Sequence, residues 1–526
     1  MPLFRNSDLS PQKRSLPSTL LCIALVSLTT GLLVALEKPA FSADRLPSPN
    51  VVIILADDLG YSDLGCYGGE IETPNLDRLA AGGIRFTQFY NTARCWPSRA
   101  AILTGYYAQQ VRRDDIPGMP SAGSRGVRPG WAKLLPEILG PVGYRAYHSG
   151  KWHVDGLPLK NGFDRSYSMN DHDRYFSPKD HTEDDKPLPA VEPGTSYYVT
   201  TAIADHAVKC LRDHAEHHAD KPFFQYLCFT SPHFPLHGVA EDIDKYRDRY
   251  LAGWDAMRAR RYARQREIGL IHCELAPRAE KTAPRWNPSE EELQRRVGPG
   301  EIGRAVAWTE LSEEQKRHQA TKMAIHAAMV DRMDRDIGRV IDQLAAMKKL
   351  DNTIIFFLSD NGASAEQIIR GEGHDPSAPL GSAKSYLGLG PGWSTMSNTP
   401  FRWHKSWVHE GGISTPLIVH WPQGISEKGR LSHVPGHVID LTPTILDVTH
   451  TERLKSWKNK PVPTPPGTSL APAFVKGGTI SHDDLWWFHD GNRAIRMGDM
   501  SKLLNQPTSA RKTLAITSKG PPHRPL

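Results

Sequence analysis

Several short, continuously apolar runs constrain the fold of this chain more than any other feature. They are rich in Val, Ile and Phe and end abruptly in polar residues, as expected of strands buried on both faces of a parallel sheet. They span 51–56, 222–229 and 353–359, and two further candidate strands lie at 143–148 and 416–421. We therefore expect an α/β fold with a large, mixed but mostly parallel central sheet flanked by helices.

Amphipathic segments lie between these runs. Apolar residues recur at helical spacing over 73–80, 202–214 and 323–346, and a further helix is predicted to begin at 131. Residues 240–310 have little β character and are interpreted as helices and loops inserted over the sheet. From about residue 452 the composition shifts to Pro, Lys and Thr, which indicates a boundary. The runs 485–488 and 494–497 fit a small antiparallel sheet in an α+β C-terminal subdomain.

The N-terminal 43 residues have the pattern of a targeting segment. Basic residues precede an apolar run over about 20–36, and the small residues Ala40, Ser42 and Ala43 follow. This pattern predicts a signal peptide at 1–43 and export to the periplasm or the exterior, with an uncleaved membrane anchor as the alternative. The other predicted parts are a catalytic domain at 44–451, a small and truncated subdomain at 452–505, and a disordered tail at 506–526.

Charge and cysteine usage exclude some classes. The formal net charge of +6 is spread over 526 residues without a Lys/Arg stripe, so nothing points to nucleic acid. Of the six cysteines, Cys22 lies in the predicted signal, and four others are widely spaced without zinc-type pairing. One disulfide among those four stays open.

Polar groups follow most of the predicted strands, and ligands of open α/β sheets collect at the carboxyl ends of strands. Carboxylate and amide oxygens without paired Cys or His favour Ca²⁺ or Mg²⁺ over zinc. Carboxylates gathered without a cation would raise one another's pKa, which a bound metal prevents. The polar groups at the strand ends are Asp57, Asp58, Lys151, His153, His233, Asp360 and Asn361.

The segment Cys95–Gly105 reads as a helix start built around a thiol. Pro97 suits the first helical position, and Gly105 suits the end of the helix. The free N–H groups and the positive end of the helix dipole would favour an anion beside Cys95, and Arg99, one turn on, is expected to project to the same place.

The string Cys95-Trp96-Pro97-Ser98-Arg99, continued by Leu103-Thr104-Gly105, resembles the signature of type I sulfatases. Further similarities are Gly150–His153, Ser231–His233 and the Lys405/Glu410–Gly412 spacing, and 397–402 resembles the arylsulfatase branch. The resemblance runs from about Asn50 to about Leu503. It implies an alkaline phosphatase-like fold and hydrolysis of a small-molecule or glycan sulfate ester.

The resemblance also implies a cofactor chemistry. Cys95 would be oxidised to formylglycine by a formylglycine-generating enzyme, and one Ca²⁺ would be held by Asp57, Asp58, Asp360, Asn361 and the modified Cys95. The aldehyde hydrate would attack sulfur, with Asp360 taking its proton. Arg99, Lys151 and Lys405 would neutralise the sulfate. His233, with Lys405, would protonate the leaving oxygen, and His153 would deprotonate the second hydroxyl to release sulfate.

Some positions depart from the family pattern. Arg94 replaces the usual small residue before the cysteine, and after Leu503 no closing strand and helix are recognisable. Two other functions stay open: a phosphomonoester or phosphonate hydrolase on the same scaffold, and a non-catalytic binder of sulfated glycans if Cys95 is not converted. Trp393, Trp403 and Trp407 are candidates for stacking on a substrate ring, with burial in the core as the alternative reading.

Overall fold

The computed structural model describes residues 48–526 except 116–124, 372, 499, 505–513 and 517–526. The predicted signal peptide at 1–43 lies outside the described residues, as does most of the predicted disordered tail. Among the helices of the described residues, none is both long and apolar enough to cross a bilayer.

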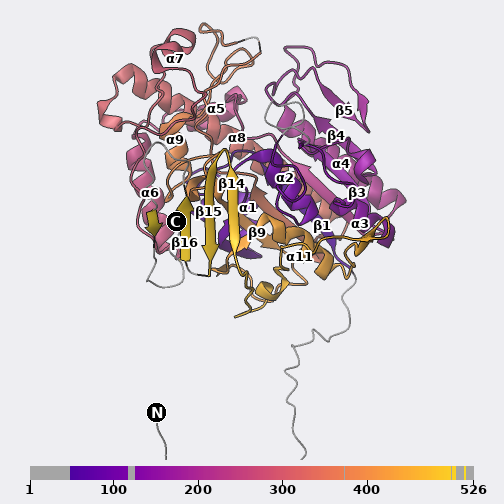
Figure 1. Cartoon of the computed structure of the whole chain (residues 1–526). Helices are drawn as coiled ribbons and strands as arrows, with labels where there is room; N and C mark the ends of the chain where they lie inside the picture. Colours follow the sequence, from indigo (N-terminus) through magenta and orange to yellow (C-terminus); the bar gives the residue numbers. More distant parts are fainter. Residues whose placement is uncertain (1–47, 116–124, 372, 499, 505–513, 517–526) are drawn as a thin grey trace, which may run out of the picture. The chain divides into compact units, whose positions relative to one another are not determined.

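The described chain is built on an 11-stranded sheet with the order β10-β2-β9-β8-β1-β7-β3-β4-β5-β6, in which β11 also pairs with β2 (Figure 1). Strands β8, β1, β7, β3 and β4 are mutually parallel, whereas β9 runs antiparallel to both of its neighbours. The strands are β1 (Asn50–Ala56), β2 (Ile84–Tyr90), β3 (Arg145–Gly150), β4 (Arg165–Met169), β5 (His181–Glu183), β6 (Lys186–Pro187), β7 (Phe223–Cys228), β8 (Thr353–Ser359), β9 (Ser414–His420), β10 (Arg430–Ser432) and β11 (Gly436–His437). The predicted mixed, mostly parallel sheet is confirmed.

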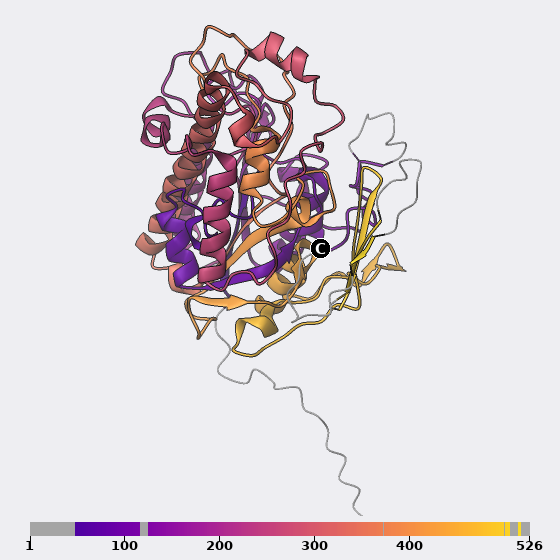
Figure 2. The same cartoon turned by 90° about the vertical axis from the view of Figure 1, so that its left-hand side faces the viewer.

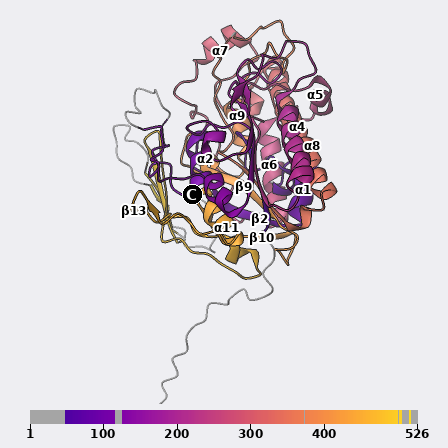
Figure 3. The same cartoon turned by 90° about the vertical axis from the view of Figure 1, so that its right-hand side faces the viewer.

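Helices cover both faces of this sheet, which explains why its central strands β1, β7 and β8 are buried throughout. Along β1, Val52 and Ile54 pack into one hydrophobic cluster, whereas Val51 and Ile53 pack into the other. Figures 2 and 3 show the long helices on one side of the sheet and α2 and α11 on the other. The helices of the first face are α1 (Pro74–Ala81), α4 (Val199–His217), α5 (Ala240–Tyr246), α6 (Gly253–Glu267), α8 (Glu313–Ala346) and α9 (Gly390–Ser397). Those of the second are α2 (Cys95–Thr104), α3 (Leu135–Leu139) and α11 (Leu441–Val448), with α7 (Glu290–Val297) and α10 (Glu410–Ile413) elsewhere in the chain.

The C-terminal segment adds two small antiparallel sheets. One has the order β14-β15-β16-β17 and the other pairs β12 (Ser456–Trp457) with β13 (Lys460–Pro461). Strands β14 (Leu485–His489) and β15 (Asn492–Met497) match the predicted hairpin, and Leu485 and Trp487 join the second hydrophobic cluster. Strand β16 (Met500–Leu504) pairs with β17 (Leu514–Ile516), which lies within the stretch predicted to be disordered. The predicted domain boundaries stay predictions.

One local expectation is corrected, and one open alternative is decided. The helix predicted from Trp131 begins at Leu135, because Leu134 is still extended and Trp131 instead packs edge-on against Tyr106. Trp393 is fully buried against Trp254 and belongs to the core. The described cysteines are all free thiols: Cys66, Cys95, Cys210, Cys228 and Cys273.

Candidate active site

The predicted site residues lie where four neighbouring parallel strands end. Asp57 follows β1, Lys151 follows β3, and Asp360 follows β8. Their backbones continue the strand pairing: the N–H of Asp57 donates to Ser231 O (3.1 Å) and that of Asp360 to Ala56 O (3.2 Å). Because β8, β1, β7 and β3 are adjacent and parallel, their carboxyl ends share one edge of the sheet.

Two of these residues have a left-handed backbone, which is uncommon outside glycine. The φ angle is 67° at Asp58 and 54° at His153. Such conformations are costly and concentrate at functional sites, where the surrounding structure holds them. The turn at each strand end thus aims a side chain that a regular continuation would aim elsewhere.

Helix α2 begins at Cys95, two residues before the predicted first helical residue Pro97, and Gly105 ends that helix as predicted, with φ 75°. The side chain of Ser98 holds the preceding loop, because its Oγ accepts from the N–H of Thr92 at 3.0 Å. Cys95 is 3% exposed. Burial raises the pKa of its thiol, although Lys151 and Lys405 act in the opposite direction, so the unmodified thiol is a poor nucleophile.

Arg99 and Lys151 meet two of the carboxylates. Nε and Nη2 of Arg99 lie 2.9 and 2.8 Å from Oδ2 of Asp360, and Nη1 donates to Lys151 O at 2.7 Å. Nζ of Lys151 lies 2.5 Å from Oδ2 of Asp57, which is 3.7 Å from Nη2 of Arg99. All four side chains are almost fully buried, so their positions are fixed by one another.

Lys405 forms an ion pair with the third carboxylate, that of Asp58. Its Nζ lies 2.8 and 2.9 Å from the two oxygens of Asp58 and 3.1 Å from Oε2 of Glu366. Oε1 of Glu366 in turn lies 3.0 Å from Nη1 of Arg94. Burial disfavours the Lys405 ammonium, but Asp58 and Glu366 more than compensate and raise its pKa, so Lys405 is cationic.

Three buried oxygens of the predicted metal ligands have no hydrogen-bond partner within the described part of the chain. They are Oδ1 of Asp57, Oδ1 of Asp360 and Oδ1 of Asn361. The amide Nδ2 of Asn361 donates to Oδ1 of Asp58 at 2.6 Å, so its oxygen is left for another partner. Ligand atoms of Asp57, Asp58 and His233 lie within 4.8 Å of one another. Orphaned buried oxygens are rare, and an all-oxygen set of this kind fits a hard cation such as Ca²⁺.

Burial and neighbouring charges shift the pKa values of the three carboxylates. Burial and the neighbouring Asp57 raise the pKa of Asp360 to about 7, despite Arg99. Burial likewise raises the pKa of Asp58, although Lys405 opposes this. The pKa of Asp57 is lowered, because Lys151 and Arg99 outweigh the cost of its burial.

The histidines at this edge are neutral. Burial, then Lys151, holds the pKa of His153 well below its usual value, and burial with Lys405 does the same for His233. His153 has a buried Nδ1 without a hydrogen-bond partner among the described residues, and its ring faces Trp96 at 5.7 Å. A neutral imidazole with a free nitrogen can accept a proton, which suits a general base.

Sequence reasoning missed several neighbours. Glu366 and the pair His172 and Asp173 lie in irregular loops without periodicity, so no sequence signal singled them out. Arg94 was noticed only as a departure, and the structure places it over the ring of Trp96 at 5.2 Å. Trp403 and Trp407 pack on each other at 5.6 Å and are half-buried.

Comparisons with known proteins identify the family of this chain. The sequence profile of the family described as Sulfatase matches residues 49–451. An uncharacterised sulfatase of Schizosaccharomyces pombe is 31% identical over 505 residues, covering 88% of this chain and 87% of that protein. The arylsulfatase of Klebsiella aerogenes is 30% identical over 455 residues, covering 80% of this chain and 91% of that one.

A solved structure agrees at the level of fold. The protein solved with its substrate D-glucosamine-2-N,6-O-disulfate has a TM-score of 0.60 at 21% identity, covering 89% of this chain and 90% of that one. The profile match spans most of the described chain and includes every strand-end residue of the site. The chain therefore belongs to the sulfatase family and is a sulfuric ester hydrolase.

Proposed function

We propose that this sulfatase uses a formylglycine made from Cys95 and one bound Ca²⁺ to hydrolyse a sulfate monoester. The supporting observation is the juxtaposition of a buried thiol at the start of α2 with three orphaned carboxylate and amide oxygens and three cationic side chains. Phosphate ester hydrolysis and simple binding of sulfated glycans are the competing functions, and no observation favours either.

The metal would be held by Asp57, Asp58, Asp360 and Asn361, with an oxygen of residue 95. There Ca²⁺ would supply positive charge that offsets the raised pKa of Asp360 and Asp58 and polarises the sulfate oxygens. Mg²⁺ is the less favoured ion, because it demands a stricter octahedral geometry than loops from separate strands readily provide.

The protein side chains provide the charge and proton steps. Arg99, Lys151 and Lys405 place positive charge around the sulfate as charge develops on its oxygens. Because Arg99 occupies Oδ2 of Asp360, Oδ1, which has two lone pairs, would both bind the metal and accept the proton of the attacking hydroxyl. The S–O bond to the alcohol breaks, and the alcohol oxygen takes a proton from Lys405 or from His233 once the bound anion has raised its pKa.

Release of the sulfate follows from the second hydroxyl of the hydrate. His153 is neutral and would remove this proton, so that the carbonyl re-forms as the C–O bond to sulfate breaks. Addition of water restores the hydrate, and the net reaction consumes one water per ester. A serine or cysteine at this position would lack the second hydroxyl. The sulfate ester formed on it would have to be hydrolysed by attack of water at sulfur.

The proposal is tested by mass spectrometry of the tryptic peptide Cys95–Arg99 from protein made in its own compartment, followed by turnover of matched aryl sulfate and aryl phosphate esters. Conversion of the thiol to an aldehyde, with the sulfate preferred, supports it. An unmodified thiol in exported protein contradicts the mechanism, and preference for the phosphate ester moves the function to the phosphohydrolase.

We also propose that the substrate is an aryl sulfate or a sulfated sugar and that the protein is exported. Two relatives support this range, the arylsulfatase named above and the human N-acetylgalactosamine-6-sulfatase, which is 27% identical over 496 residues and covers 86% of this chain and 70% of its own. The N-terminal charge and hydropathy pattern supports export, where a formylglycine-generating enzyme would act on the chain.

A further inference from the structure

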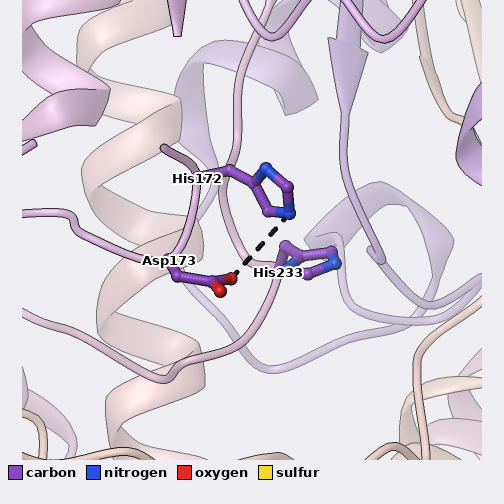
Figure 4. Close-up of side chains that lie close together, drawn as sticks. All are labelled: His172, Asp173 and His233. Atoms are coloured by element: carbon purple, nitrogen blue, oxygen red, sulfur yellow. Dashed lines mark ion pairs between the residues drawn. The ribbon is translucent and has the colours of Figure 1, made fainter. Parts of the chain in front are cut away.

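A cluster of two histidines and one carboxylate lies beside the proposed active site. His172 and Asp173 come from the loop between β4 and β5, and His233 comes from the loop after β7. Figure 4 shows the three side chains converging, and their ligand atoms lie within 4.8 Å of one another. His233 is 4% exposed, whereas the side chains of His172 and Asp173 are partly exposed.

Hydrogen bonds fix which nitrogen of each ring carries its proton. Nδ1 of His172 lies 3.2 Å from the carbonyl oxygen of Asn170, and Nδ1 of His233 lies 2.5 Å from that of Phe234. A carbonyl oxygen only accepts, so Nδ1 is the donor in both rings. The Nε2 atoms are therefore the ones that can present a lone pair. Anchoring of one ring nitrogen by a carbonyl is the usual arrangement of metal-binding histidines.

Asp173 is the third residue of this cluster. Nε2 of His172 lies 3.8 Å from Oδ1 of Asp173, which is too far for a hydrogen bond. Oδ1 is buried and has no hydrogen-bond partner within the described part of the chain. The cation Arg370 lies on the other oxygen, with Nη1 3.9 Å from Oδ2. The lone-pair atoms of the cluster, Oδ1 and the two Nε2 atoms, thus include no proton donor.

We propose that His172, Asp173 and His233 form a binding site for Zn²⁺ or a similar borderline divalent cation, separate from the proposed Ca²⁺ site. Two imidazoles and one carboxylate are a recurring zinc ligand set that leaves a further position open to water or a substrate oxygen. Nitrogen donors favour zinc and its neighbours over the hard Ca²⁺, for which the strand-end oxygens are better suited.

Occupation of this site has a consequence for catalysis, and this part rests on the proposed function. His233 Nε2 is also 3.8 Å from Oδ2 of Asp58, so the same atom faces both sites. Zinc on His233 removes the lone pair that would take up a proton for the leaving oxygen. Zinc is therefore expected to inhibit sulfate ester hydrolysis while Ca²⁺ stays bound.

Binding is tested on the purified full-length protein in excess Ca²⁺, by titrating Zn²⁺ against a chromophoric chelator and Co²⁺ by its visible absorption. Expected are one Zn²⁺ per chain beyond Ca²⁺, a Co²⁺ spectrum of low coordination number, and affinity at least about 10-fold weaker in both His172→Ala and Asp173→Asn. His217→Ala removes an exposed histidine of α4 and is the matched control, expected to bind zinc as the wild type does. Thermal melting verifies that each variant is folded.

Equal zinc affinity in the wild type and in both folded variants would overturn the site, as would zinc binding that weakens in proportion to added Ca²⁺. Inhibition is read separately, as the ratio of rates with and without Zn²⁺ within each variant. In the wild type this ratio should fall over the same Zn²⁺ concentrations at which the ion binds. In His172→Ala both the binding and the inhibition should shift to higher Zn²⁺ concentrations. Because the binding and spectral readouts need no turnover, a protein that hydrolyses no sulfate ester would contradict the proposed function and still test the metal site.

Discussion

The buried carboxylates of the proposed active site, Asp57 and Asp360, and the buried Asp63 have opposite properties, although Asp57 and Asp63 both follow β1. Asp63 is fully satisfied: Oδ1 lies 2.6 Å from Nη1 of Arg261, and Oδ2 lies 3.0 Å from Nε2 of His326 and accepts from the N–H of Gly60. Despite the cost of burial, His326 and Arg261 lower the pKa of Asp63 to about 2. Asp57 and Asp360, in contrast, each keep an oxygen without a partner among the described residues.

The difference separates a structural network from a binding site. A buried ion pair with complete hydrogen bonding holds the fold, and loss of one partner leaves an uncompensated charge. A carboxylate that is left incomplete costs stability unless a ligand completes it. The raised pKa of Asp360 and the lowered pKa of Asp63 express this contrast, although burial acts on both residues in the same direction.

The largest expected effect separates chemistry from stability. Cys95→Ala removes the proposed nucleophile, so activity on an aryl sulfate should fall by at least about 10⁴-fold. The melting temperature should stay close to that of the wild type, because the Cys95 side chain takes part in none of the ion pairs described above. Steady-state kinetics and calorimetry measure the two effects. Substantial residual turnover would mean that another group is the nucleophile.

A matched pair of substitutions tests the comparison directly. Asp63→Asn should lower the free energy of unfolding by about 3 kcal/mol, because the buried His326 loses its carboxylate partner, although Arg261 keeps Glu70. Asp58→Asn should change it by less than about 1 kcal/mol in calcium-free buffer, because Lys405 keeps Glu366. Denaturant unfolding and calcium titration measure both.

Calcium affinity provides the reverse ordering for the same pair. Asp58→Asn should weaken Ca²⁺ binding by at least about 10-fold, whereas Asp63→Asn, once folded, should bind it as the wild type does. A large stability loss in Asp58→Asn without any change in calcium binding would make Asp58 a structural residue like Asp63.

The pH dependence of stability distinguishes the two sets by sign. The pKa of Asp360 is raised to about 7 in the folded protein. In calcium-free protein the free energy of unfolding should therefore fall as pH rises from about 4 to 7. The pKa of Asp63 is lowered to about 2, so its contribution is lost only as pH falls below about 4. Relative to the wild type, Asp360→Asn should therefore gain melting temperature between pH 5 and 7.5.

Calcium is the control for this pH experiment. Added Ca²⁺ should abolish the relative gain of Asp360→Asn, because the ion stabilises the ionised wild-type carboxylate. If the difference in melting temperature stays constant across this range, the pKa of Asp360 is not raised in the folded protein.

The smallest expected effect concerns Glu366, which links Arg94 to Lys405. Glu366→Gln keeps the shape but removes the charge that fixes both cations, so kcat should fall by about 10-fold with a smaller change in KM. Lys455→Ala removes half of an exposed ion pair with Glu452 and is the control, expected to change neither activity nor stability measurably. A kcat unchanged in Glu366→Gln would show that Lys405 is held by Asp58 alone.

Much of the architecture could be predicted because its signals are local. The continuous apolar run before Asp57 indicates a doubly covered strand, and the register of β1 with β7 and β8 confirms it. The Cys95 segment predicted its own helix start and end. The start of α3 and the burial of Trp393 could not be predicted in this way, because tertiary packing decides where an extended segment turns and which aromatic ring is enclosed.

The site, like the fold, has some features that the local sequence determines and others that tertiary packing decides. The sequence alone determined which side chains follow the strands, and parallel pairing then requires that they share one edge. The tertiary structure alone decided that Glu366 joins Arg94 to Lys405, that Oδ1 of Asp360 is left without a partner among the described residues, and that His172 lies beside His233. These contacts depend on irregular loops, whose paths are fixed by long-range hydrogen bonds and burial and have no periodicity for a sequence to carry.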